Sequence, residues 1–201
     1  MALPPASPQR QFRHRRSIDV QIFSCGGGLW EVDAELRDAR PTATRLAAAV
    51  REAGDPIHDM LLRIVVDERL NIVAAGSESR WMPYVGHCDK HGDAYSRLVG
   101  LNLLKGFRQA VKERLSGVLG CTHITELTQV LPTAVIQAFA GTVLDTSEDS
   151  GADAPPFQLD RCHALRRDGE AVRTFYPRWH RPARDDNPGS ARSDPTAERS
   201  P

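Results

Sequence analysis

The spacing of apolar residues in this chain changes partway along, from an alternation typical of strands to a spacing typical of helices. Ile18 to Ile22 and Leu29 to Leu36 both alternate, and the turn Gly26-Gly27-Gly28 separates them. Met60 to Val66 and Leu70 to Ala74 show a second pair of strand-like runs. Alternation with a period of two is the signature of a strand with one buried face. The first half of the chain is therefore predicted to form two hairpins.

Helical spacing dominates the middle of the chain. Asp93 to Leu104 places its leucines on one face, and Gly106 to Leu115 continues the helical pattern after a break or bend at Gly106. Thr122 to Ala140 carries a single apolar stripe. Pro132 lies within this stripe and should kink or split the helix. The Ala-rich stretch from Thr42 to Ala53 fits either a short helix or a long loop.

The last pattern lies near the C-terminal end. Ala164-Leu165 and Val172 to Tyr176 flank Arg166-Arg167-Asp168-Gly169, and Asp-Gly is a strong hairpin turn. The order of strands, helices and hairpin predicts an α+β fold. We expect a small, mainly antiparallel sheet with two to three helices packed on one face, and a C-terminal hairpin.

Chain length and local composition suggest the domain organisation. The 201 residues suffice for one domain with a proper core, and we place it at residues 17–180. Residues 1–16, rich in Pro, Gln and Arg, are expected to form a flexible N-terminal segment. Residues 181–201 have almost nothing to bury and are expected to be a disordered tail. An acidic stretch of small residues at 145–156 reads as a loop within the domain.

Charge and hydropathy exclude several classes of partner. The 26 basic and 26 acidic residues balance, so no overall field recruits nucleic acid or a membrane surface. No run approaches the ~18 apolar residues of a membrane span. Met1 to Pro8 lacks the basic and apolar segments of a secretory signal, so the expected location is cytoplasmic, where cysteines stay reduced.

Three of the four cysteines lie beside, or next but one to, a histidine. The three couples are His87-Cys88, Cys121-Thr122-His123 and Cys162-His163. Thiolate and imidazole are ligands that zinc and iron favour, and they also form thiol nucleophiles. A fold that gathers these couples would create a metal or thiol site.

The best-framed couple lies at the expected start of a helix. Gly120 allows a close approach of the backbone, and Thr122 is a plausible N-cap. Cys121 would then lie where the helix dipole favours a thiolate, with His123 in the first turn. Glu126, three residues further on, projects from nearly the same side. One helical turn thus offers a thiolate, an imidazole and a carboxylate.

Metal binding is the leading interpretation of these residues. The predicted ligands are three thiolates and one imidazole, from Cys88, Cys121, His123 and Cys162. Zinc is the expected metal, and iron or an iron–sulfur cluster is the alternative. A closed set of four ligands would make the metal structural. If one of the four residues did not bind the metal, water could take the vacant coordination position. The site would then be catalytic, with Glu126 or His163 placed for proton transfer.

Three other interpretations remain open. As a small-molecule lyase or hydrolase, the protein would use this Cys/His site, with a ligand pocket near Trp81, Tyr84 and Tyr95. In a thiol enzyme, Cys121 would be the nucleophile and His123 the base, with Glu126 orienting it. As a non-enzymatic interaction module, the protein would recruit a partner through its tail. In the last interpretation, the cysteines are buried small residues without a chemical role.

Several short runs together resemble those of a known family. They are Gly28-Leu29-Trp30, Met82-Pro83-Tyr84 with Cys88, Leu98-Val99-Gly100-Leu101, Gly106-Phe107-Arg108, Gly120-Cys121-Thr122-His123 with Glu126-Leu127, Cys162-His163-Ala164-Leu165, and Tyr176-Pro177-Arg178-Trp179. From Ser17 to about Trp179 the chain resembles an uncharacterised bacterial family catalogued as domain of unknown function 2889. This resemblance implies no particular activity. A weaker likeness, carried by Gly120-Cys121 before a helix, is to iron–sulfur scaffold proteins of the nitrogen-fixation type.

Overall fold

The computed structural model describes residues 3–47, 49–91, 93–148 and 153–182. The chain divides into two compact units, Met1–Val143 and Leu144–Pro201. Residues 183–201 of the expected tail and residues 149–152 of the expected loop lie outside the described ranges.

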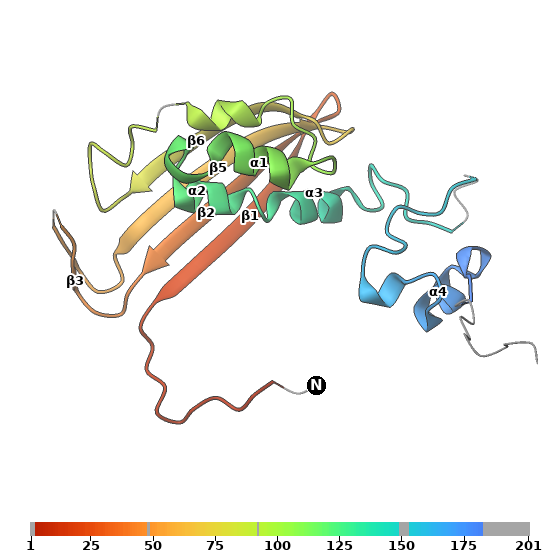
Figure 1. Ribbon diagram of the computed structural model, residues 1–201, viewed down its shortest axis with the longest axis horizontal. Helices are drawn as coiled ribbons and strands as arrows, with labels where there is room; N and C mark the ends of the chain where they lie inside the picture. Colours follow the sequence, from red (N-terminus) through yellow and green to blue (C-terminus); the bar gives the residue numbers. More distant parts are fainter. Residues whose placement is uncertain (1–2, 48, 92, 149–152, 183–201) are drawn as a thin grey trace, which may run out of the picture. The chain divides into compact units, whose positions relative to one another are not determined.

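The first unit is built on a four-stranded antiparallel sheet (Figure 1). Its strands are β1 (Arg15–Gly26), β2 (Leu29–Ala39), β5 (Pro56–Asp67) and β6 (Ile72–Trp81), paired in the order β1-β2-β5-β6. Both predicted hairpins, β1-β2 and β5-β6, are therefore confirmed.

One face of this sheet forms the core, and helices cover it (Figure 1). The helices are α1 (Phe107–Leu115), α2 (Thr122–Leu127) and α3 (Leu131–Phe139). Beneath them, alternate residues of the two central strands are buried: Val32, Ala34, Leu36, Met60, Leu62, Ile64 and Val66. Burying this apolar surface drives the helices onto the sheet. The α+β prediction is confirmed.

The helical stripe from residue 122 to residue 140 is split into two helices. Pro132 lies in the first turn of α3, where its missing N–H costs no hydrogen bond. The predicted helix from Asp93 to Leu104 is reduced to the single 3-10 turn η1 (Ala94–Leu98). It stops because Gly100 takes a positive φ of 82° and the next residues bond to β6 instead. No helix in the described residues combines the length and apolar character needed to cross a membrane.

The stretch between β2 and β5 contains two short paired strands, β3 (Thr44–Arg45) and β4 (Val50–Arg51). Each is two residues long, so this segment is a small excursion from the main sheet.

The second unit corrects one prediction. In place of a C-terminal hairpin it contains two 3-10 turns, η3 (His163–Leu165) and η4 (Pro177–Trp179), and between them the helix α4 (Glu170–Phe175). The Gly169 carbonyl accepts the first helical hydrogen bond, from the amide of Arg173. Glu170 and Arg173 form an ion pair one turn apart, and Val172 is buried. These contacts favour a helix after the Asp-Gly pair.

Candidate functional site

Strand register brings three ionisable residues side by side on the helix-covered face. Asp38 of β2 lies directly opposite Arg16 of β1 and directly opposite His58 of β5. Asp38 continues the inward-facing series that includes Leu36, so its side chain is only 2% exposed. Residues opposite one another on a sheet face have touching side chains. The sheet therefore holds a buried carboxylate between a guanidinium and an imidazole.

The Asp38 carboxylate is fully engaged. Arg16 donates from Nε to Oδ1 at 2.8 Å and from Nη2 to Oδ2 at 2.7 Å, in a bidentate pair. His14 Nε2 lies 3.1 Å from Oδ1, and His58 Nδ1 lies 3.0 Å from Oδ2. A buried charge is tolerated when it is paired and hydrogen-bonded in this way.

These contacts set the charges at the site. Burial disfavours the carboxylate of Asp38, but Arg16, His58 and His14 outweigh burial and lower the pKa of Asp38 to about 2. Burial is also the main influence on His58 and lowers the pKa of its imidazole, although Asp38 opposes this shift. Near neutral pH, the site thus contains an anionic Asp38 beside a neutral His58.

The lowered pKa of Asp38 predicts a loss of stability in acid. Its folded value of about 2 is below the ordinary 3.8, so the unfolded chain binds the proton more readily. The stabilisation is therefore present above about pH 4 and is lost as the pH falls through about 2, a change of about 2 kcal/mol. The free energy of unfolding of the metal-free protein, measured in urea at several pH values between about 4 and about 2, tests this loss of stability.

A matched pair of variants tests this assignment. Asp38→Asn should be less stable at pH 5 and should show a flatter dependence on pH below it. Asp33→Asn removes the carboxylate that binds Arg63 on the opposite face of β2 and should keep the acid dependence of the wild type. An unchanged acid dependence in Asp38→Asn would show that other carboxylates cause it.

Helix α2 adds two more groups from above the sheet. Its buried residues Ile124 and Leu127 pack it against β2 and β5. His123 stacks on His58 with ring centroids 3.7 Å apart, and its Nε2 lies 3.9 Å from Oδ2 of Asp38. Glu126 accepts a hydrogen bond from Nη1 of Arg16. The helix thereby completes a cluster that the strands begin.

The start of α2 is held in place by a buried phenol. The Tyr95 hydroxyl accepts from the amide of Cys121 at 3.0 Å, donates to its carbonyl at 2.8 Å, and contacts Oγ1 of Thr125 at 2.9 Å. Burial raises the pKa of Tyr95 to about 12, so the phenol stays protonated. Gly120 fits because a Cβ there would lie 2.9 Å from the carbonyl oxygen of Leu115.

Cys121 lies near Nδ1 of His123, whereas Asp38 lies near Nε2 of the same ring. Its Sγ is 3.9 Å from Nδ1 of His123, within reach of a weak sulfur hydrogen bond. Burial by itself would raise the pKa of the Cys121 thiol. The hydrogen bond with His123 and the backbone amides of Ile124 and His123 have a larger, opposite effect, so the pKa is lowered overall. His123 thus stands between a thiol and a carboxylate, the order found in thiol–imidazole–carboxylate sites.

The donor atoms of the cluster are also close enough together to hold a metal ion. One ligand atom from each of Asp38, His58 and His123 lies within 4.8 Å of the others. Two imidazoles and a carboxylate are ligands that zinc and iron accept.

The structure places the predicted site residues in different parts of the chain. It brings Cys121, His123 and Glu126 together at α2, and of the four predicted ligands the cluster above includes His123. Cys88 lies in the loop between β6 and η1, and Cys162 and His163 lie in the second unit. The four-ligand set, and the roles of Glu126 and His163 in proton transfer, stay predictions.

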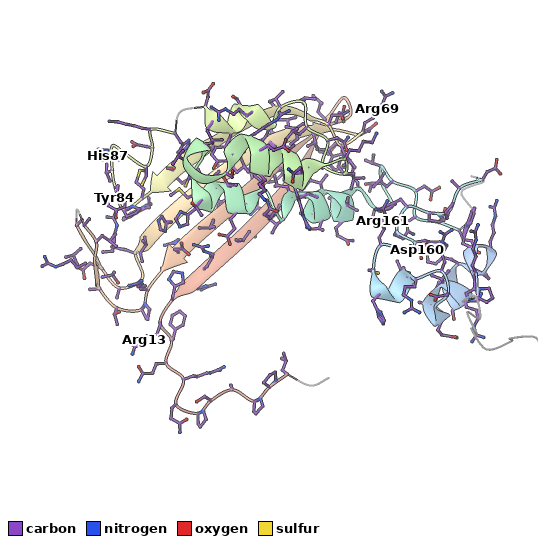
Figure 2. The ribbon with its side chains drawn as sticks, viewed as in Figure 1. Arg13, Arg69, Tyr84, His87, Asp160 and Arg161 are labelled. Atoms are coloured by element: carbon purple, nitrogen blue, oxygen red, sulfur yellow. The ribbon has the colours of Figure 1, made fainter. Side chains whose placement is uncertain are left out.

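The expected ligand pocket near Trp81 and Tyr84 also stays a prediction. Trp81 ends β6, and the guanidinium of Arg51 lies 4.8 Å from its ring centroid. Tyr84 is 52% exposed and lies with His87 in the loop after β6 (Figure 2).

Sequence reasoning missed Asp38 and His58. The signal was present, since Asp38 lies two residues after the inward-facing Leu36 and His58 lies two residues before the inward-facing Met60. A charged or polar side chain at a buried position of an alternating strand needs a partner. Such a position marks a candidate site even when no motif surrounds it.

Comparisons with known proteins support the family resemblance. The family model described as "Protein of unknown function (DUF2889)" matches residues 14–137, well over half of the chain. This stretch includes every residue of the cluster at Asp38, whereas Cys162 and His163 lie beyond it. The match gives no support to the likeness to iron–sulfur scaffold proteins, and no curated protein and no solved structure matches the chain. The chain therefore belongs to the family of proteins of unknown function designated DUF2889.

Proposed function

We propose that this protein binds a divalent transition metal through Asp38, His58 and His123, with zinc as the first choice and iron as the second. The observation that carries the proposal is the convergence of these three donors, from β2, β5 and α2, within 4.8 Å of one another. Three protein ligands leave a coordination position for water or a small molecule, which is the pattern of catalytic rather than structural zinc.

The distances are close to those that an ion would require. Ligand atoms bound at about 2.0–2.1 Å in a tetrahedral site lie about 3.3 Å apart. His58 Nδ1 and His123 Nε2 lie 3.0 Å and 3.9 Å from the same Asp38 oxygen, on either side of that value. An ion bound there would replace the direct hydrogen bond between His58 and Asp38.

The local charge also favours a cation. Asp38 and Glu126 supply two carboxylates, and Arg16 contacts both, so one negative charge is left uncompensated. Arg16 and His14 bind the carboxylate of Asp38 in the way that outer-shell partners orient metal ligands. Cys121 contacts His123 through Nδ1, which leaves Nε2 available to a metal.

Metal analysis of purified protein tests the proposal. We expect about one zinc or iron per chain in the wild type, and a fall to near zero in His58→Gln/His123→Gln, because two of three ligands are lost. Removing the metal with a chelator should lower the melting temperature of the wild type, and adding zinc back should restore it. The same treatment should leave the double variant unchanged.

The matched control is His87→Gln, which removes an imidazole from the loop after β6 and should retain the metal. Full metal content in the double histidine variant would refute this site. Cys88→Ser and Cys162→Ser distinguish this site from the four-ligand site predicted from the cysteine couples. If the metal is bound by Asp38, His58 and His123, both variants should retain it. A loss in either would instead favour the four-ligand site predicted from the cysteine couples.

A further inference from the structure

A pocket of about 440 Å³ lies on the face of the sheet opposite the helices. It is bordered by the segment leading into β1, by the adjoining ends of β1 and β2, and by the connections beyond β2. Its lining residues are Phe12, Arg15, Ser17, Arg37, Ala39, Arg40, Pro41 and Gly54. Figure 2 labels Arg13, which lies in the segment that leads into β1.

Strand register explains why the pocket is separate from the cluster at Asp38. Ser17 lies opposite Arg37, and Arg15 lies opposite Ala39. Because successive side chains of a strand point to opposite faces, these four residues face away from Arg16 and Asp38. The same two strand ends therefore form a carboxylate-centred cluster on one face and a basic pocket on the other.

Among the described residues that line the pocket, three are arginines and none is acidic. Within the described residues, the side chains of Arg15, Arg37 and Arg40 have neither a hydrogen bond nor an ion pair, unlike Arg16, Arg63 and Arg80 of the same sheet. Three uncompensated guanidinium groups around one cavity repel one another unless an anion lies between them. Arginine is also the side chain best shaped for bidentate binding of phosphate.

We propose that this pocket binds a compact organic phosphate. Arg15, Arg37 and Arg40 would hold the phosphate group, and Ser17 offers a further hydrogen-bond donor. Phe12, with 63% of its surface exposed, offers a ring on which an apolar or planar part of the ligand can lie. The volume of the cavity suits a small molecule of this kind.

The charges next to the pocket favour a compact ligand over an extended polyanion. The next outward-facing pair along β1 and β2 is Asp19 and Glu35, followed by Gln21 and Asp33. A nucleic acid strand leaving the pocket along the sheet would meet these carboxylates, whereas a small phosphate ester would not reach them.

Calorimetric titration of the full chain with phenyl phosphate and with inorganic phosphate tests the proposal. The wild type should bind both, and phenyl phosphate more tightly. Arg15→Ala/Arg37→Ala should weaken both association constants roughly tenfold or more, because charge-assisted hydrogen bonds to phosphate are lost. Phe12→Ala should weaken phenyl phosphate selectively and leave inorganic phosphate unchanged.

The matched control is Lys105→Ala/Arg108→Ala, which removes two positive charges next to and within α1 and should keep both affinities within about twofold of wild type. Thermal unfolding checks that every variant is folded. The proposal is overturned if the wild type shows no saturable binding up to about 10 mM, or if the control loses as much affinity as the pocket variant. An unselective effect of Phe12→Ala would overturn the role of the ring.

Discussion

Replacing Asp38 with alanine is expected to lower the free energy of unfolding by about 3 kcal/mol, because it leaves Arg16 and His58 without their shared acceptor. The carboxylate is 2% exposed and is bound by both of these side chains and by His14. The cost lies at the lower end of the range for breaking a buried ion pair, since Arg16 is 34% exposed and keeps Glu126. Urea unfolding at pH 7 measures it.

Asp33→Ala provides the comparison. This residue of the same strand pairs with Arg63 on the outer face, where Arg63 is 52% exposed, so its loss should cost less than about 1 kcal/mol. Arg16→Met in the Asp38→Ala background should recover part of the lost stability, because the uncompensated charge is then removed as well. Equal costs for Asp38→Ala and Asp33→Ala would mean that the buried cluster does not stabilise the fold.

Replacing Gly120 with alanine is expected to lower the free energy of unfolding by about 2–3 kcal/mol, because its methyl group has no space. The new Cβ would lie 2.9 Å from the Leu115 carbonyl oxygen, 3.2 Å from the Tyr95 hydroxyl and 3.3 Å from Oγ1 of Thr125. The first of these atoms belongs to the backbone. The other two are hydrogen-bonded to one another, and the Tyr95 hydroxyl also holds the backbone of Cys121. Thermal and urea unfolding measure the effect.

Gly76→Ala is the matched control, since a Cβ at Gly76 of β6 would meet no atom of the described residues within 4 Å. It should change stability by less than about 0.5 kcal/mol. Gly120→Ala should also weaken metal binding, because any shift at the start of α2 displaces His123. A Gly120→Ala variant as stable as the wild type would show that the backbone at Leu115 can shift to make room for the methyl group at little cost.

The helix and strand predictions succeeded where the determining interactions are local. Pro132 cannot occupy a helix interior without losing a hydrogen bond, which predicts a kink or a split in the stripe from residue 122 to residue 140, and the structure shows the split. The hairpins were predictable for the same reason, since alternation and turn residues act over a few positions.

The Asp168-Gly169 prediction failed because the dipeptide fits two local structures. It can occupy a hairpin turn, and it can also precede a helix, as it does before α4. The choice depends on the burial of Val172 and on the Glu170–Arg173 pair, which supports a helix and not a strand. Periodicity over so short a segment does not distinguish these outcomes.

By itself, the sequence determined the α+β class, the strand hairpins, the split helix and the family, together with the grouping of Cys121, His123 and Glu126 within one turn. Only the tertiary structure decided that His123 meets Asp38 and His58, and that Glu126 binds Arg16. The physical reason is the range of the interactions. Spacing along the chain reports contacts within one element, whereas this cluster depends on the register of three strands and on the packing of α2 across them.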